Sequence, residues 1–311
     1  MSVVCMGELL IDFVALERGV SVGEASGFQK APGGAPANVA VAVSRLGYEA
    51  AFLGQVGDDP FGHYLAEVLS SEGVDIHGLR FSQEARTPLA FVSLTAEGER
   101  SFVFYRHPSA DMLLRADQVA LEVLVGKKIF HFGSISLIDD PSRSATLMTA
   151  QSAHTHGLVI SYDPNLRMEL WPNADAARTG MMTGMNYAHI VKLSDDEVQF
   201  LTGGNDIAPL WRAETQIIAV THASKGATLY TRKDKLDVPG FSVRALDSTG
   251  AGDGFVAGML VGILEFWGNH MAHLPEIARF ANAVGALATT QLGAIPALPS
   301  RTAVDRFIQG P

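Results

Sequence analysis

A glycine-rich turn near the C-terminus, Asp247-Ser248-Thr249-Gly250-Ala251-Gly252-Asp253, carries the clearest chemical signal in the sequence. The pattern predicts a strand at residues 243–246 before this turn and an apolar helix, about residues 255–267, after it. Small residues at a helix N-terminus leave backbone N–H groups exposed, and the helix dipole favours an anion there. Asp253 would repel a bound phosphate, so its carboxylate is better suited to take a proton from a hydroxyl group as a phosphoryl group arrives. The turn therefore predicts phosphoryl transfer to an alcohol.

Two other phosphate-binding motifs fit this segment poorly. A dinucleotide-binding fingerprint needs a third glycine where Phe255 stands, and the chain has no Walker A loop. A purely structural glycine turn, in which Asp253 interacts only with the helix dipole, stays open as an alternative at this stage.

A second cluster of small residues, Ala31-Pro32-Gly33-Gly34-Ala35-Pro36-Ala37-Asn38, lies near the N-terminus. Two adjacent glycines let a ligand approach the backbone closely, and Asn38 can both donate to and accept from sugar hydroxyls. We expect Asp12 at the end of the first strand, where carboxylates of open α/β sheets point into the ligand crevice. The alternative roles are a turn residue for Asp12 and a helix cap for Asn38.

The elements that position these residues alternate between strands and helices. β-Branched runs predict strands at 3–6, 51–56, 128–132, 158–162, 189–192 and 216–221, and helical spacing of apolar residues predicts helices at 37–46, 61–71, 142–154 and 195–201. This alternation predicts an α/β fold with a mostly parallel central sheet covered by helices on both faces.

Two pairs of predicted strands have no helix between them. Residues 89–95 and 101–106 form a predicted hairpin with its turn at 96–100, and residues 13–16 and 28–31 could supply two more strands. Such a small sheet acts either as a lid, formed by segments of about 13–31 and 87–107, or as an edge hairpin without a role. No linker divides the sequence, so we expect one domain over residues 1–311.

The composition excludes several classes of protein. The 311 residues are 47% hydrophobic and 18% charged with a formal net charge of −10, which argues against disorder and against binding to nucleic acid or a membrane surface. The single cysteine, Cys5, excludes a disulfide framework and a cysteine-based zinc site. His154-Thr155-His156 has no further ligand at metal spacing. Because no targeting or membrane-spanning segment is visible, we expect a cytoplasmic protein.

Together, the two glycine clusters resemble the signatures of the ribokinase-like (phosphofructokinase B) family of carbohydrate kinases, and the resemblance covers essentially the whole chain. Within the family the sequence is most similar to the fructokinases. The segments that carry this closer likeness are 7–13, 32–38, 54–62, Phe104-Tyr105-Arg106 with Ala110-Asp111, and Asp163-Pro164-Asn165-Leu166-Arg167. The resemblance implies a ribokinase-like three-layer α/β/α fold with a small β-sheet lid.

The resemblance also implies roles for particular residues. Asp253 would be the general base, and the backbone amides of Gly250, Ala251 and Gly252 would form an anion hole. The residues that would contact the sugar are Asp12, Gly33, Gly34, Asn38, Arg106, Arg167 and Asp253.

The resemblance implies nucleotide and metal sites with some departures from the family pattern. Glu197 matches the glutamate of an Asn-x-x-Glu magnesium segment, but Ser194 replaces the asparagine. Thr221–Gly226 matches a nucleotide loop, but Ala223 replaces its middle glycine. The residues implied in nucleotide binding are Lys192, Glu197, Thr221, Ser224, Gly226, Gly252 and Asn282, and those at the places of a potassium site are Asp247, Thr249, Ala288 and Gly293.

The function that this resemblance implies is transfer of the γ-phosphoryl group of ATP, with Mg²⁺, to a primary hydroxyl of a hexose, D-fructose first. Its implied partners are the sugar, ATP and a second copy of the chain that pairs through the lid. A 2-keto-3-deoxygluconate kinase is the alternative, since Arg106 and Arg167 are compatible with an anionic substrate. A non-catalytic sugar or nucleotide sensor is an alternative of a different class, although it predicts loss of Asp253, Gly250 or Gly252.

Overall fold

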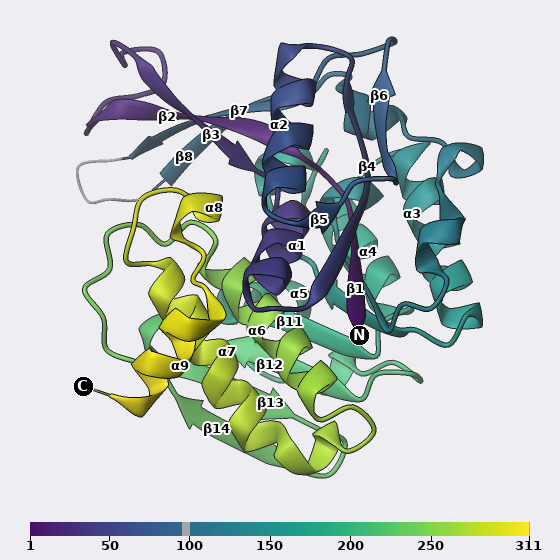
Figure 1. Ribbon diagram of the computed structural model, residues 1–311, viewed down its shortest axis with the longest axis vertical. Helices are drawn as coiled ribbons and strands as arrows, with labels where there is room; N and C mark the ends of the chain where they lie inside the picture. The colour runs from purple at the N-terminus through teal and green to yellow at the C-terminus, as the bar shows by residue number, and fades with distance from the viewer. Residues whose placement is uncertain (95–99, 311) are drawn as a thin grey trace.

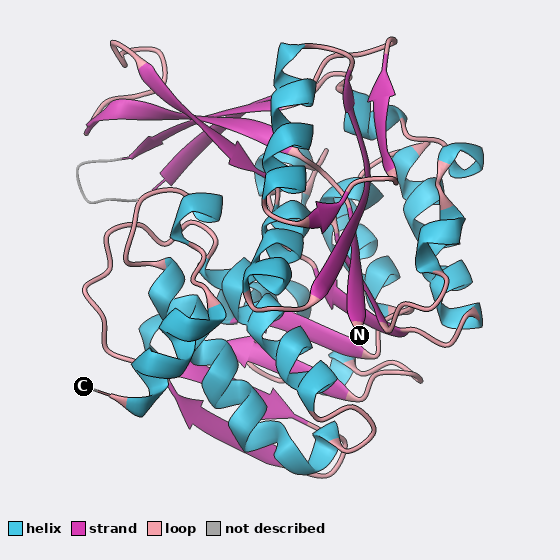
Figure 2. Cartoon of the chain, viewed as in Figure 1, coloured by secondary structure: helices cyan, strands magenta, loops and turns pink. Residues whose placement is uncertain are grey.

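A large, mostly parallel sheet forms the centre of the molecule (Figures 1 and 2). The computed structural model describes residues 1–94 and 100–310. The sheet runs in the order β14-β13-β12-β11-β10-β9-β1-β4-β5, and β6 also pairs with β4. Its strands are β1 (Ser2–Met6), β4 (Glu49–Gly57), β5 (Val74–Asp75), β6 (Leu79–Ser82), β9 (Ile129–Gly133), β10 (Val159–Asp163), β11 (Ile190–Ser194), β12 (Ile217–Thr221), β13 (Gly226–Tyr230) and β14 (Lys235–Pro239). Only the β12–β13 and β13–β14 pairings are antiparallel among the described pairs of this sheet.

Helices cover both faces of this sheet, as the alternation of strands and helices predicts. The α-helices are α1 (Ala35–Arg45), α2 (Pro60–Ser71), α3 (Ser142–Thr155), α4 (Ala174–Met185), α5 (Asp195–Thr202), α6 (Ala251–Glu265), α7 (Leu274–Ala288), α8 (Ala294–Ala297) and α9 (Arg301–Gln309). Short 3-10 helices occur at η1 (Ala110–Leu113), η2 (Ala116–Gln118), η3 (Leu121–Leu124), η4 (Ile135–Leu137), η5 (Met168–Leu170), η6 (Ala208–Leu210), η7 (Ala223–Lys225) and η8 (His270–His273).

The side-chain alternation of β1 shows how one strand serves two cores. Val3 and Cys5 pack with α1, α6 and α7, whereas Val4 and Met6 pack on the opposite face with α3 and α4. A strand that is buried on both faces has no polar side, which is why β1 is a continuous apolar run in the sequence. Burial raises the pKa of the Cys5 thiol far above its ordinary value, so this thiol is unreactive in the folded protein.

Helix α6 packs unusually closely on α7. Gly254, Gly258 and Gly262 lie four residues apart on the α6 face that contacts α7. A Cβ atom on Gly258 would lie only 2.7 Å from the Cα atom of Ala281 in α7. The glycines therefore allow a close approach of the two backbones, and they hold α6 firmly in the core.

A separate four-stranded sheet projects from the main one (Figure 1). It runs in the order β3-β2-β7-β8, with β2 (Leu10–Arg18), β3 (Phe28–Gly33), β7 (Leu89–Leu94) and β8 (Arg100–Tyr105). We call it the small sheet. The predicted hairpin is confirmed as β7 and β8, which pair antiparallel. Residues 95–99, which include most of the turn predicted at 96–100, lie outside the described residues.

Two expectations about the strands are wrong. Residues 243–246 form no strand, because β14 at the edge of the sheet ends at Pro239 and the following chain leaves the sheet as an exposed loop. Asp12 does not end the first strand: β1 ends at Met6, and Asp12 lies in β2 of the small sheet, where it pairs with Ala31. In the described residues, no helix is long and apolar enough to cross a membrane.

Candidate active site

One cavity collects residues from the small sheet, from the start of α1, from strand ends of the main sheet and from the start of α6. Its lining includes Glu8, Leu10, Asp12, Gly34, Ala35, Asn38, Phe102, Phe104, Ile135, Asp163, Asn165, Arg167, Lys192, Ser248, Thr249, Gly250, Gly252 and Asp253. The structure thus brings the two glycine clusters, which are about two hundred residues apart in the sequence, to the same cavity.

The turn before α6 presents Asp253 and its own backbone to this cavity. Gly250 takes a left-handed conformation (φ 79°) just before the helix, and no side-chain cap of this N-terminus is found among the described residues. Ala251 N donates a long hydrogen bond, 3.3 Å, to the Ser248 oxygen. An uncapped N-terminus leaves N–H donors for an anion, as the sequence predicts. Ala251 and Gly252 form the first turn together with Asp253, which is 8% exposed. The alternative of a purely structural turn is disfavoured because Asp253 lines the cavity.

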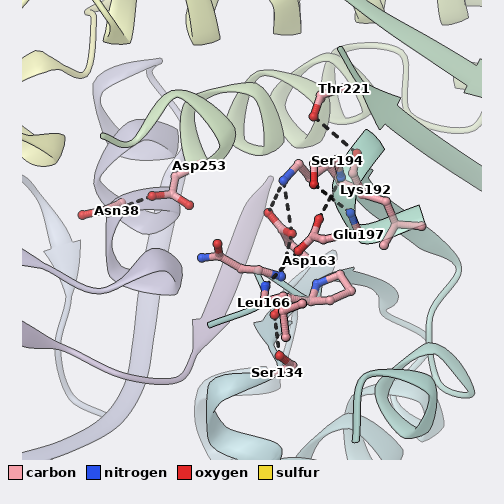
Figure 3. A network of polar contacts seen from close by, with 12 residues as sticks. Asn38, Ser134, Asp163, Leu166, Lys192, Ser194, Glu197, Thr221 and Asp253 are labelled. Atoms are coloured by element: carbon pink, nitrogen blue, oxygen red, sulfur yellow. Dashed lines mark hydrogen bonds and ion pairs between the residues drawn. The ribbon is translucent and has the colours of Figure 1, made fainter. Parts of the chain in front are cut away.

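A hydrogen bond from Asn38 fixes the Asp253 carboxylate (Figure 3). Asn38 Nδ2 donates to Asp253 Oδ2 over 2.8 Å, which links the first turn of α1 to that of α6. Burial raises the pKa of Asp253, although this hydrogen bond and the charges of Lys192 and Arg167 act in the opposite direction. A carboxylate with a raised pKa is a better proton acceptor, which fits the predicted role of Asp253 as a base.

Lys192 places its ammonium group beside the start of α6. A Cβ atom on Gly252 would lie 3.3 Å from Lys192 Nζ, so the ammonium group is next to the exposed amides of this turn. Lys192 Nζ also pairs with Asp163 Oδ2 at 3.2 Å (Figure 3). A cation and a helix N-terminus that converge in this way fit a polyphosphate.

The glycines before α1 are required by close contacts. A Cβ atom on Gly33 would lie 2.2 Å from Asp12 Oδ2, and one on Gly34 would lie 2.3 Å from the backbone oxygen of Glu8. Gly34 also has a φ of 112°, which L-residues rarely adopt. The Glu8 carboxylate accepts a hydrogen bond from Ala35 N at 2.9 Å, and burial raises the pKa of Glu8 to about 7. Glu8 therefore holds the N-terminus of α1 in place.

The two predicted substrate arginines have different surroundings. Arg167 lines the cavity, where its Nη1 donates to Asn165 Oδ1 and to the Leu166 oxygen. Its guanidinium group lies 5.7 Å from the ring centre of Phe102 in the small sheet. Arg106 is not part of the described lining: it is 4% exposed and donates two hydrogen bonds to Asp111 Oδ2, at 2.6 and 2.8 Å.

Glu197, the residue predicted to bind magnesium, links two segments of the chain through hydrogen bonds. Its Oε1 accepts from Leu166 N and its Oε2 from Ser194 N, both at 2.8 Å (Figure 3). Ser194 caps α5 and accepts in turn from Glu197 N, so the two residues form a reciprocal capping box at the start of this helix. Because each Glu197 oxygen already accepts a backbone N–H, this carboxylate would reach a metal ion most readily through water.

The predicted nucleotide loop follows β12 and meets the end of β14. Ala223, at the place of the missing glycine, takes a left-handed φ of 48°. Gly226 has a φ of 105° and contacts the backbone of residues 238–240. Ser224 is exposed, and Thr221 donates to the Leu193 oxygen at 3.3 Å (Figure 3). These loop residues lie outside the described cavity lining.

Asn282 approaches this loop from α7, although its amide is already engaged. Its Nδ2 donates to the backbone oxygens of Val238 and Pro239, both at 3.1 Å. Asn282 thus ties α7 to the end of β14, and in this structure that amide group holds the loop.

The four residues at the places of a potassium site lie around one loop. Asp247 Oδ1 accepts from Thr249 N and Oγ1, and its Oδ2 accepts from Gly293 N at 2.8 Å. Asp247 N donates to the oxygen of Thr289, the residue after Ala288. The structure therefore brings these segments together beside the start of α6.

Several lining residues were missing from the sequence prediction. Asp163 directly follows a predicted strand, and carboxylates at strand ends of open α/β sheets face the ligand crevice, so its position carries a signal. Phe102 and Phe104 alternate along β8 and both line the cavity, but alternation alone did not say which face of the small sheet is covered. Glu8 gave no signal, because nothing in the sequence shows that a glutamate caps a helix many residues later.

A histidine cluster at the other end of the strands does not suit a metal ion. His154, His189 and Glu214 have ligand atoms within 4.8 Å of one another. His189 Nδ1 accepts a hydrogen bond from Ile160 N at 2.8 Å, so in the neutral ring the proton is on Nε2. A protonated Nε2 cannot ligate a metal, so His189 is not available as a ligand in this tautomer.

Comparison with known proteins gives consistent matches over the whole chain. The profile of the pfkB family carbohydrate kinases matches residues 1–301. A probable fructokinase-4 from Arabidopsis thaliana is 48% identical, with 99% of this chain and 97% of the relative covered. Fructokinase-2 from Oryza sativa subsp. japonica is also 48% identical, with 98% and 93% covered.

Two solved structures are close to this one. The crystal structure of fructokinase with bound ATP from Xylella fastidiosa has a TM-score of 0.91 at 37% identity, covering 99% of this chain and 98% of that one. The fructokinase from Vibrio cholerae O395 in its fructose, ADP and calcium ion bound form has a TM-score of 0.88 at 36% identity, with the same coverage.

Proposed function

This chain belongs to the pfkB family of carbohydrate kinases, and we propose that it is an ATP-dependent fructose kinase that forms fructose 6-phosphate. The observation that carries the proposal is the Asp253 carboxylate, which lies in the first turn of an uncapped helix and faces the same cavity as Asn38 and the glycines before α1. The fructokinases that match this chain over nearly its full length support fructose as the acceptor.

Each part of the reaction has a residue that suits it. The oxygen of the sugar hydroxyl attacks the γ-phosphorus of ATP while Asp253 accepts the proton of that hydroxyl. The bond between the γ-phosphorus and the bridging oxygen, which stays with ADP, breaks. The amides of Gly250, Ala251 and Gly252 and the Lys192 ammonium group stabilise the negative charge of the transferred group. Asp12, Gly33, Gly34 and Asn38 bind the sugar from the side of the small sheet.

The nucleotide lies, in this proposal, along the loop after β12. Thr221, Ser224 and Gly226 contact ATP, with Asn282 behind them. Magnesium, when bound with ATP, neutralises charge on the phosphates, and Glu197 is the residue we assign to it, through water. Asp247, Thr249, Ala288 and Gly293 would surround a potassium ion beside the anion hole.

The cavity suits a neutral sugar better than a sugar acid. Arg106 is paired with Asp111 away from the described lining, and Lys192 is paired with Asp163. Arg167 is the remaining cation of the lining, and it lies close enough to Asp253 to lower the pKa of that residue. A substrate carboxylate would therefore find one cation and several acidic groups, which disfavours 2-keto-3-deoxygluconate.

We assign the small sheet the role of a lid. Phe102 and Phe104 on β8 line the cavity, and closure of such a sheet over the sugar would exclude water as a competing acceptor. Leu16, Val103 and Tyr105 are exposed hydrophobic residues of the same sheet. Their exposure supports pairing of two copies of the chain through this sheet.

A coupled ADP-release assay over fructose, ribose, 2-keto-3-deoxygluconate and adenosine tests the function. We expect fructose to give the fastest turnover, and we expect Asp253→Asn to lower kcat by about 10²–10⁴-fold because the base is lost. Equal rates of the Asn variant and the wild type would remove Asp253 from the mechanism. Preference for the keto acid would overturn the substrate, and no turnover of any acceptor would favour the sensor alternative.

A further inference from the structure

A buried ion pair joins the carboxyl ends of two neighbouring strands in the cavity. Asp163 is the last residue of β10, and Lys192 lies in β11. Lys192 Nζ lies 3.2 Å from Asp163 Oδ2 and 3.3 Å from Oδ1, and the two side chains are 10% and 6% exposed. Asp163 thus contacts the ammonium group with both carboxylate oxygens.

The backbone holds Asp163 in this orientation. Asp163 Oδ1 also accepts a hydrogen bond from Asn165 N at 3.1 Å, in the turn that follows β10. Asn165 has a left-handed φ of 48°, a conformation that asparagine tolerates better than most residues. The carboxylate is therefore anchored by its own loop as well as by the lysine.

No other described acid is as well placed to hold Lys192. Glu197 accepts backbone amides with both oxygens, and Asp253 is held by Asn38. Burial lowers the pKa of Lys192, but the Asp163 charge, together with Glu197 and Asp253, more than compensates and raises it. The ammonium group thus remains charged beside Gly252.

We propose that Asp163 is a positioning residue for phosphoryl transfer. It holds the Lys192 ammonium group next to Gly252, where the transferred phosphoryl group passes. This inference rests on the proposed kinase activity and deepens it. Asp163 itself does not touch the phosphoryl group. Its contribution is that Lys192 is already charged and oriented before ATP binds, so that no reorganisation is needed during the reaction.

A kinetic double-mutant cycle with Asp163→Asn and Lys192→Met tests this role. If Asp163 acts through Lys192, the Asn substitution lowers kcat by about 10–100-fold in the wild type and by less than about 3-fold in the Lys192→Met background, because the coupled group is already gone. The KM for the sugar stays within about twofold, since no sugar contact changes. Equal losses in both backgrounds would overturn the proposal and show that the carboxylate acts independently, for instance on the metal ion.

Two further variants separate positioning from folding. Asp163→Glu keeps the charge but displaces it by one methylene group. We expect a several-fold lower kcat with an unchanged melting temperature, and a wild-type kcat would overturn the proposal.

Asp111→Asn removes the acid of another buried ion pair. We expect it to lower the melting temperature and to combine additively with Lys192→Met in kcat.

Binding of a non-hydrolysable ATP analogue, measured by calorimetry without sugar, distinguishes failure of this inference from failure of the proposed function. We expect Asp163→Asn to weaken binding of the analogue about tenfold in the wild type and much less in the Lys192→Met background. If the coupling is seen but fructose is not turned over, the substrate assignment fails and the pair keeps its role. If the analogue binds with no coupling between the two residues, the inference fails and the kinase assignment stands.

Discussion

Two buried ion pairs among the described residues have similar exposure but different surroundings. Arg106 and Asp111 are each 4% exposed in their side chains, whereas Lys192 and Asp163 are 10% and 6% exposed. The arginine donates two hydrogen bonds to its partner, and Ser109 donates to the other oxygen of Asp111. The lysine faces a cavity and lies beside an uncapped helix N-terminus.

The difference teaches that burial of a charged pair does not by itself indicate a functional site. In the first pair the hydrogen-bonding groups are turned toward one another, so the pair fixes the chain that leaves β8. In the second pair, an ammonium group with three donors lies at the cavity wall, next to amides that have no cap. The first pair should therefore matter for folding, and the second for turnover.

The largest expected effect is loss of stability in Arg106→Met. The substitution leaves the Asp111 carboxylate buried without its cation, which costs about 3–5 kcal/mol of unfolding free energy. Urea denaturation followed by circular dichroism measures this loss. A double variant, Arg106→Met with Asp111→Leu, should recover part of it. If stability is unchanged and the KM for fructose rises more than about tenfold, Arg106 acts on the substrate, as the sequence predicts.

Lys192→Met tests the other half of the comparison. We expect kcat to fall by about 10²–10³-fold, because a preorganised charge beside the transferred group is lost. The melting temperature should change little, since methionine fills much of the same volume. A large loss of stability with a nearly normal kcat in the folded protein would make the two pairs equivalent and would contradict the distinction.

Glu8→Gln extends the comparison to pH, because Glu8 lines the cavity and also interacts electrostatically with Arg106 and Asp111. Its folded-state pKa of about 7 is above the ordinary value of 4.5, so the folded protein binds the proton more tightly than the unfolded chain. The stability that this proton contributes is present below about pH 4.5 and is lost as pH rises through about 7. Relative to wild type, the Gln variant should gain on the order of 2–3 kcal/mol between pH 4 and pH 8.

Chemical denaturation of both proteins across this pH range measures that gain. The Gln side chain still accepts the Ala35 amide, so the fold of α1 should not change. A difference between the two proteins that does not vary with pH would show that Glu8 titrates normally.

The smallest effect is expected at an exposed pair with the same separation. Lys235 Nζ lies 3.2 Å from Asp237 Oδ2, as in the Lys192 pair, but both side chains are more than half exposed. Because water screens such a pair, Lys235→Met should leave both the melting temperature and kcat unchanged within error. A clear loss of either would show that distance, rather than surroundings, decides what an ion pair contributes.

The sequence predicted most elements of the fold because their signals are local. The strand predicted at 3–6 and the helices predicted at 61–71 and 195–201 each depend on the pattern of neighbouring residues, and they are confirmed as β1, α2 and α5. The strand expected at 243–246 failed because strand propensity does not say whether a partner strand is available at the sheet edge. Asp12 was assigned to the wrong strand because the short break at residues 7–9 has no strong turn signal.

The candidate site was predictable to the extent that its motifs are continuous in the sequence. Gly250–Asp253 and Gly33–Asn38 were found in this way, and the structure brings both to one cavity. The pairings between them were not predictable, because the bonds Asn38–Asp253 and Asp163–Lys192 join residues from distant segments. Arg106 could not be recognised as the partner of Asp111 for a different reason: the two are only five residues apart, but the segment between them is irregular and has no periodic pattern that would predict the contact.

The row of glycines on α6 makes turnover depend on how this helix packs in the interior of the protein. Gly254 and Gly258 set the distance between α6 and α7, and the amides that would hold the phosphoryl group are at the N-terminus of α6. A side chain added at Gly258 would push α6 away from α7, and the anion hole would move with it. A substitution that changes the packing between these two helices should therefore affect turnover as well as stability.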